Sequence, residues 1–138
     1  MTQYARTLYT AKVRTRGGRD GQSQSTDGRL DIRLSGHDSA GTDTNPEQLL
    51  AAAWSACFEA EMQAAARRLN VALPVGAAIQ AEIDLNVAGA DCFLGARLKV
   101  SLPGLARHVG LAIVDAAHRT CPYSKATRGN VDVALSLV

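Results

Sequence analysis

The residues of this chain that are best suited to chemistry are its three cysteines, Cys57, Cys92 and Cys121. A cysteine reacts as its thiolate, and an oxidised thiolate becomes a sulfenic acid that a second thiol can convert to a disulfide. We expect the chain to be cytoplasmic, and structural disulfides are rare in that compartment. The cysteines are therefore expected to be free, metal-binding or redox-active thiols.

Each cysteine also has an ordinary structural interpretation. Cys57 lies in an apolar stretch, where it is suited to fill space in a buried helix. Cys121 precedes Pro122, which biases the backbone before it away from helical angles, so Cys121 is suited to end a helix. Cys92 falls in a predicted hairpin loop with no neighbour that suggests chemistry. His118 and Cys121 are three residues apart, but no second pair has metal-ligand spacing, so no metal site is expected.

The composition excludes several classes of protein. A length of 138 residues predicts a single domain, 1–138, with a sizeable core. The net charge is +2 and both signs are interspersed, without the basic stripe of a nucleic-acid-binding surface. No run of 18 apolar residues occurs, so neither a membrane span nor a membrane partner is expected.

Alternation of apolar and polar residues predicts most of the strands. Period-two patterns favour half-buried strands in "RLDIRLS" (29–35), "AIQAEIDLNV" (78–87) and "FLGARLKVSL" (93–102). The loop "AGADC" joins the last two as a hairpin, and their one-sided apolar faces indicate antiparallel pairing. Weaker strands are predicted at Tyr4–Thr15, Gln22–Ser25 and Val131–Leu137.

Two helices are predicted to cover the sheets. The first opens in "TNPEQLLAAAWSACF", with Asn45 as N-cap, Pro46 at the first helical position and Gln48 completing a capping box. It should continue to about Leu69, and from Leu49 to Phe58 it is apolar almost all round, which indicates a central, buried helix. The second should span about Leu105–Thr120. The order β-β-β-α-β-β-α-β predicts an α+β fold.

Three motifs together resemble one family. "GGRDG" at Gly17–Gly21, "TNPEQLLAAAWSACF" and "CPYSKATRGNVDV" occur in the order found in the organic hydroperoxide resistance (Ohr) branch of the OsmC/Ohr family. The resemblance extends from Tyr9 to Val138. It implies antiparallel strands packed around two central helices in an intertwined homodimer. It also implies a thiol-dependent peroxidase that reduces organic hydroperoxides to alcohols.

The resemblance assigns roles to individual residues. It implies that Cys57 attacks the peroxide, that Cys121 resolves the product as a transient disulfide, and that Arg19 and Glu47 activate the thiolate. No bound cofactor or metal is implied. The implied reductant is an external dithiol, either a lipoyl group on a lipoylated protein or a small dithiol. The apolar substrate pocket is expected to include Trp54, Phe58 and Tyr123.

The thiolate needs a cation because an ordinary cysteine has a pKa of about 8.5 and burial raises it. The N-terminus of its own helix is too distant, since Cys57 follows Pro46 by eleven residues, about 16 Å. An arginine about 4 Å away is worth roughly 4 kcal/mol, or about three pKa units, and Arg19 is the candidate. Glu47 lies about 15 Å from Cys57 on one straight helix. Either the chain before Leu49 folds back, or Arg19 and Glu47 come from a second subunit, as the resemblance favours.

Some residues depart from the family pattern. Glu59 and Glu61 follow Cys57 where relatives are apolar, and Lys125 replaces the asparagine of the Ohr motif. These residues keep two alternatives open: an OsmC-type hydroperoxide reductase with another peroxide preference, or a non-enzymatic thiol sensor or ligand-binding module on the same fold. Loss of the charged pair would favour the module, but Arg19 and Glu47 are both present.

Overall fold

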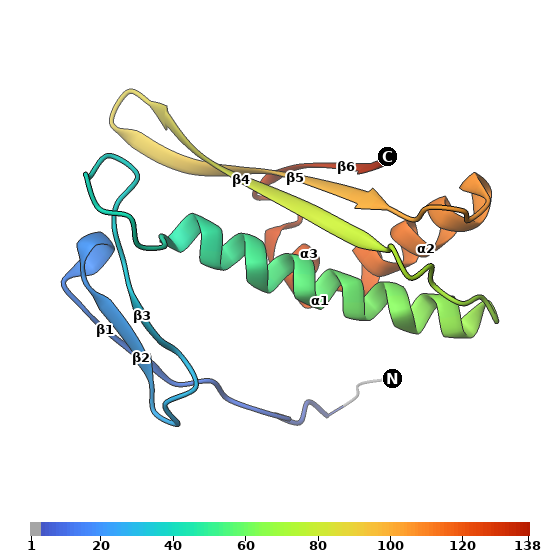
Figure 1. The fold of residues 1–138 in the computed structure, drawn as a ribbon, viewed down its shortest axis with the longest axis horizontal. Coiled ribbons are helices and arrows are strands. Elements are labelled where there is room, and N and C mark those ends of the chain that lie inside the picture. Colours follow the sequence, from blue (N-terminus) through green and yellow to red (C-terminus); the bar gives the residue numbers. More distant parts are fainter. Residues whose placement is uncertain (1–3) are drawn as a thin grey trace. The chain divides into compact units, whose positions relative to one another are not determined.

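The computed structural model describes residues 4–138, in two compact units that divide after Pro46 (Figure 1). The predicted order of strands and helices is confirmed, with two short helices added. The single domain remains a prediction, and each unit is described by itself. The elements are β1 (Val13–Arg16), η1 (Gly18–Asp20), β2 (Gln22–Ser25), β3 (Asp31–Arg33), α1 (Pro46–Arg68), β4 (Ala78–Ala88), β5 (Asp91–Ser101), α2 (Arg107–Thr120), α3 (Pro122–Thr127) and β6 (Asp132–Leu137).

The first unit contains a three-stranded antiparallel sheet in the order β1-β2-β3. Its third strand follows the predicted alternation, with Ile32 half-buried between exposed Asp31 and Arg33, and Leu34 is buried directly after the strand. The predicted strand Tyr4–Thr15 is wrong over most of its length, because only Val13–Arg16 pairs with β2. Residues 4–12 are exposed and have no regular structure. On this side of β2 all four of its residues pair with the four residues of β1, so β2 leaves no strand partner for the segment before Val13.

The "GGRDG" motif forms the connection between β1 and β2. Gly17 has φ 81° and Gly18 has φ 60°, in the left-handed region that favours glycine. A Cβ at Gly21 would lie 1.8 Å from the carbonyl oxygen of Arg16, so no side chain fits there. The intervening turn of 3-10 helix carries Arg19 at the end of the hairpin.

The second unit is organised around α1, which begins at Pro46 as predicted and ends one residue before Leu69. The helix is stopped by Asn70, whose φ of 55° is a left-handed conformation that Asn tolerates. The predicted second helix is confirmed as α2. None of the helices within residues 4–138 has an apolar stretch long enough to cross a bilayer.

The sheet of the second unit has the order β4-β5-β6. The predicted antiparallel hairpin is confirmed, with its turn at Gly89 and Ala90. Cys92 lies inside β5 opposite Val87, which corrects its predicted loop position. β6 runs parallel to β5, contrary to the antiparallel expectation, because the chain crosses through α2 and α3 before it returns to the sheet.

One hydrophobic core joins α1, α2 and the inner face of this sheet, with the helices on one side of the strands (Figure 1). Trp54 and Phe58 of α1 are almost completely buried in it, and so is Leu98 of β5. Cys121 belongs to the same core with no exposed surface. The other fully buried large side chains are Met62, Ile113 and Val100.

The helix α3 is an addition to the two helices that the sequence predicts. Pro122 occupies its first position, where a missing N–H and a fixed φ suit a helix start. Cys121 therefore ends α2 and also precedes α3, with φ −61° and ψ 123°. Six residues carry too little periodicity for such a helix to be recognised from the sequence.

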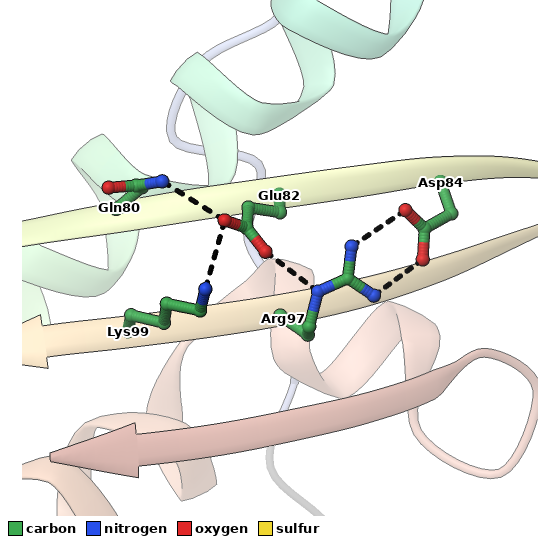
Figure 2. Close-up of polar contacts among 5 residues, drawn as sticks. All are labelled: Gln80, Glu82, Asp84, Arg97 and Lys99. Atoms are coloured by element: carbon green, nitrogen blue, oxygen red, sulfur yellow. Dashed lines mark hydrogen bonds and ion pairs between the residues drawn. The ribbon is translucent and has the colours of Figure 1, made fainter. Parts of the chain in front are cut away.

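The outer face of the sheet carries a cluster of opposite charges, here called the Arg97 cluster and shown in Figure 2. Arg97 donates to Asp84 over 2.6 and 2.7 Å and to Glu82 over 2.7 Å. Lys99 donates to Glu82 over 3.1 Å, and Gln80 donates to the same carboxylate over 3.0 Å. These five residues alternate with the apolar residues of β4 and β5, so charge lies on one face and the core on the other.

Candidate functional site: a pair of thiols between two helices

The structure brings Cys57 and Cys121 together. Cys57 is half-buried on α1, and Cys121 is completely buried at the junction of α2 and α3. Both are free thiols, and they lie close enough that interaction with the Cys121 side chain is among the causes that raise the pKa of Cys57. Residues separated by 64 positions in the sequence therefore form one two-thiol site, whereas Cys92 is exposed on β5.

Hydrogen bonds fix the Cys121 side of this site. The N–H of Cys121 donates to Ala117 O over 2.8 Å, and its carbonyl accepts from the N–H of Lys125 over 2.9 Å. Deeper in the core, Trp54 Nε1 donates to Ser124 Oγ over 3.2 Å, and Ser124 Oγ lies 3.0 Å from His118 Nδ1. The junction is thus bonded to both of its helices and to α1.

The surroundings of Cys57 keep its thiol protonated. Burial and the hydrogen bond to Cys121 raise the pKa of Cys57 to about 11, and negative charge at Cys121 or Glu61 adds to the rise. A hydrogen bond from the backbone N–H of Tyr123 acts in the opposite direction and lowers this pKa. The two charge effects on this pKa, from Cys121 and Glu61, both oppose ionisation of Cys57.

Two effects on the pKa of Cys57, one from the backbone of Tyr123 and one from Glu61, were not predicted from the sequence. The backbone N–H of Tyr123 reaches Cys57 because α3 begins at Pro122, and the proline after Cys121 was the available signal. Glu61 was noted only as a charge at an unexpected position. It lies one helical turn beyond Cys57 and accepts a hydrogen bond from Thr120 Oγ1 over 2.9 Å.

The residues expected to line a substrate pocket have different surroundings. Trp54 and Phe58 are buried in the core, and the Phe58 ring lies 6.3 Å from the His118 ring. Tyr123 is 39% exposed beside the thiols. A hollow of about 410 Å³ lies elsewhere, on the outer face of the sheet, and none of the cysteines lines it. Its lining includes Asp84, Asn86, Phe93, Gly95, Arg97 and Asp132.

The predicted activating pair is divided between the two units. Arg19 is exposed on η1 in the first unit, and Glu47 lies in the first turn of α1 in the second. Because α1 is helical from Pro46 onward, the chain before Leu49 does not fold back, which excludes one of the two alternatives for Glu47. Glu47 and Cys57 of one chain are ten residues apart on this helix, about 15 Å. Among residues 4–138, no group of three His, Cys, Asp or Glu side chains is placed to hold a metal.

Known proteins are similar to this chain in sequence and in fold. A family model for OsmC-like proteins matches residues 36–136. The organic hydroperoxide resistance protein of Xanthomonas axonopodis pv. citri is 38% identical over 99% of this chain and 99% of its own. The organic hydroperoxide resistance protein OhrB of Bacillus subtilis is 42% identical over 94% of this chain and 98% of its own. The crystal structure of Bacillus subtilis OhrB covers 96% of this chain and 100% of its own, with a TM-score of 0.89, which confirms the predicted α+β fold class. The chain therefore belongs to the OsmC-like protein family, in its branch of organic hydroperoxide resistance proteins.

Proposed function

We propose that this protein acts in resistance to organic hydroperoxides, as a thiol-dependent peroxidase that uses Cys57 and Cys121. The names of its relatives support the resistance role. The observation that carries the mechanism is the proximity of a half-buried thiol on α1 to a second thiol at the α2–α3 junction, close enough for the second to raise the pKa of the first. A peroxidase of this kind needs both sulfurs within bonding reach.

The first step reduces the peroxide. The Cys57 thiolate attacks the terminal oxygen of ROOH, the O–O bond breaks, and the departing alkoxide takes a proton to become the alcohol. Cys57 is oxidised by two electrons to a sulfenic acid. The step requires the thiolate, because the thiol is a poor nucleophile.

The second step protects the oxidised sulfur. The Cys121 thiol attacks the sulfenic sulfur, an S–S bond forms, and the OH group leaves as water. An external dithiol then reduces the disulfide by exchange and is itself oxidised to a disulfide, which restores both thiols. A lipoyl-type dithiol is the reductant that we propose, with a small dithiol as a substitute.

We infer that the missing positive charge is supplied by Arg19, held by Glu47, from the second subunit of a homodimer. Two observations support this arrangement. The pKa of Cys57 is raised, and the charges that act on it, at Cys121 and Glu61, both oppose ionisation, while α1 carries Glu47 about 15 Å away from the thiol of its own chain. A guanidinium beside the thiolate would favour ionisation, and a carboxylate matches its fork geometry.

The test is a peroxidase assay with cumene hydroperoxide, a fatty-acyl hydroperoxide and hydrogen peroxide, driven by a lipoyl-based reducing system. Cys57→Ser should abolish peroxide consumption. Cys121→Ser should complete one turnover and then stop, with Cys57 over-oxidised to a sulfinic acid that mass spectrometry detects. Cys92→Ser is the matched control, and its turnover should equal that of the unmodified chain.

The outcomes separate the alternatives. Continued turnover by Cys57→Ser would refute the mechanism. A preference for hydrogen peroxide over cumene hydroperoxide would indicate the OsmC-type activity. Stoichiometric oxidation of the two thiols without multiple turnover in any dithiol would indicate a sensor.

A further inference from the structure

Glu61 connects the helix that carries Cys57 to the helix end that carries Cys121. It lies four residues after Cys57, a spacing that places both side chains on the same face of α1. Its Oε2 accepts a hydrogen bond from Thr120 Oγ1 over 2.9 Å. Thr120 is the last residue of α2 and immediately precedes Cys121. A single hydrogen bond thus links the two elements beside the two thiols.

The Thr120 hydroxyl has two acceptors within reach but only one hydrogen to donate. Its Oγ1 lies 3.1 Å from the carbonyl oxygen of Ala116 in the same helix and 2.9 Å from Glu61. Threonines in helices commonly bond back to the preceding turn, whereas a charged acceptor forms the stronger hydrogen bond. Glu61 therefore directs the hydroxyl from its own helix across to α1.

Cys121 cannot move independently of Thr120. The backbone of Cys121 is hydrogen-bonded to Ala117 on one side and to Lys125 on the other. The position of the α2–α3 junction therefore sets the position of the Cys121 sulfur. We propose that Glu61 is a positioning residue for disulfide formation: through Thr120 it holds this junction against α1 and keeps Cys121 within reach of Cys57.

The charge of Glu61 gives this assignment independent support. A carboxylate near Cys57 opposes formation of the thiolate, so it contributes nothing to the acidity of the attacking sulfur. What it offers the site is the geometric link, since its carboxylate is a strong acceptor for the Thr120 hydroxyl. The inference rests on the proposed function for the place of the disulfide in a cycle, but the contact itself requires no peroxide.

The experiment measures the effective concentration of the Cys57–Cys121 pair in glutathione redox buffers, using the full chain with Cys92→Ser. In this exchange the two thiols lose two electrons and two protons, and one oxidised glutathione becomes two reduced molecules. Glu61→Leu and Thr120→Val should each lower the effective concentration about tenfold, as expected for one hydrogen bond to a charged group. The double variant should lose no more than either single variant, because both substitutions remove the same bond.

Conservative variants and a matched control test whether the loss of effective concentration comes from the Glu61–Thr120 hydrogen bond. Thr120→Ser keeps the hydrogen bond and should retain the effective concentration, and Glu61→Gln, whose neutral carbonyl accepts more weakly, should retain more of it than Glu61→Leu. Glu59→Leu should also retain it, because Glu59 is two residues from Cys57 and does not share its face of α1. In a second readout, the pH dependence of Cys57 alkylation, Glu61→Gln should lower the pKa of Cys57 and Thr120→Val should not.

Unchanged effective concentrations in Glu61→Leu and Thr120→Val, or losses that add in the double variant, would overturn the proposal. Thr120 is exposed, so Thr120→Val tests the bond even if Glu61→Leu does not fold. The redox assay contains no peroxide. A chain with intact coupling but no peroxide turnover would therefore refute the proposed function and leave this inference standing.

Discussion

The Arg97 cluster and the thiol pair are both built from ionisable groups of residues 47–138, but only the cluster contains its own counter-charges. Hydrogen bonds from Arg97 hold the pKa of Asp84 and of Glu82 below their usual range. Burial, Cys121 and Glu61 instead raise the pKa of Cys57 to about 11. The sheet surface stabilises charged groups, whereas the core stabilises a neutral thiol.

The difference distinguishes a structural arrangement of charges from a functional one. The Arg97 cluster is satisfied on one sheet face and requires nothing from another part of the molecule. At the thiol site the N–H of Tyr123 lowers the pKa of Cys57, but burial, Cys121 and Glu61 raise it by more. A thiol in that condition is weakly nucleophilic, so the proposed mechanism needs a positive charge beside it.

The largest predicted effect concerns that missing charge. Arg19→Ala should lower the rate of Cys57 alkylation at neutral pH by about two to three orders of magnitude, because an adjacent guanidinium is worth roughly 4 kcal/mol. The measurement is the pH dependence of alkylation by iodoacetamide. Arg29→Ala is the matched control, since Arg29 is exposed in the same unit and pairs only loosely with Asp27 over 3.8 Å. Unchanged titration of Cys57 in Arg19→Ala would remove Arg19 from the site.

Mixed dimers sharpen this prediction. If Arg19 acts across the interface, refolding equal amounts of inactive Cys57→Ser and Arg19→Ala chains should restore about one quarter of the peroxidase activity, because half of the dimers regain one intact site of two. No recovery, with dimers formed, would place Arg19 and Cys57 of the same chain in one site.

An intermediate effect is expected from the buried hydrogen bonds behind the thiols. Ser124→Ala leaves Trp54 Nε1–H without its partner in the core, which should reduce the free energy of unfolding by about 1–3 kcal/mol. Urea unfolding followed by Trp54 fluorescence measures the change. Ser136→Ala, on the exposed face of β6, should have almost no effect. Equal stability of the two variants would show that this bond contributes nothing to the core.

The smallest effect is expected from the Arg97 cluster, because it is partly exposed and screened by solvent. Arg97→Gln should lower Tm slightly at pH 7, and the difference should shrink at high salt. Since the pKa values of Glu82 and Asp84 are lowered in the folded chain, their contribution is present above the unfolded values of about 4. It is lost as pH falls through the lowered values. Thermal unfolding between pH 7 and pH 2 checks this trend, and a difference in Tm that grew on acidification would contradict it.

Local patterns in the sequence were sufficient for most of the fold. The alternation in β4 and β5 predicted both the pairing and the face that is buried, because a strand's two sides are visible as alternate residues. Pro46 predicted the start of α1 because proline is preorganised for a first helical turn. Two features of the fold could not be predicted from such local patterns. β6 pairs in parallel because of the path of the whole chain, and α3 is too short for a periodic signal.

The sequence by itself determined which residues are capable of redox chemistry, since the identities of Cys57 and Cys121 and the motifs around them require no coordinates. Only the tertiary structure decided that these thiols lie near each other, that the backbone of Tyr123 lowers the pKa of Cys57, and that Thr120 bonds to Glu61. The reason is physical: residue type and helix spacing act over a few positions, whereas a contact across 64 positions depends on how α2 and α3 pack against α1 in a shared core.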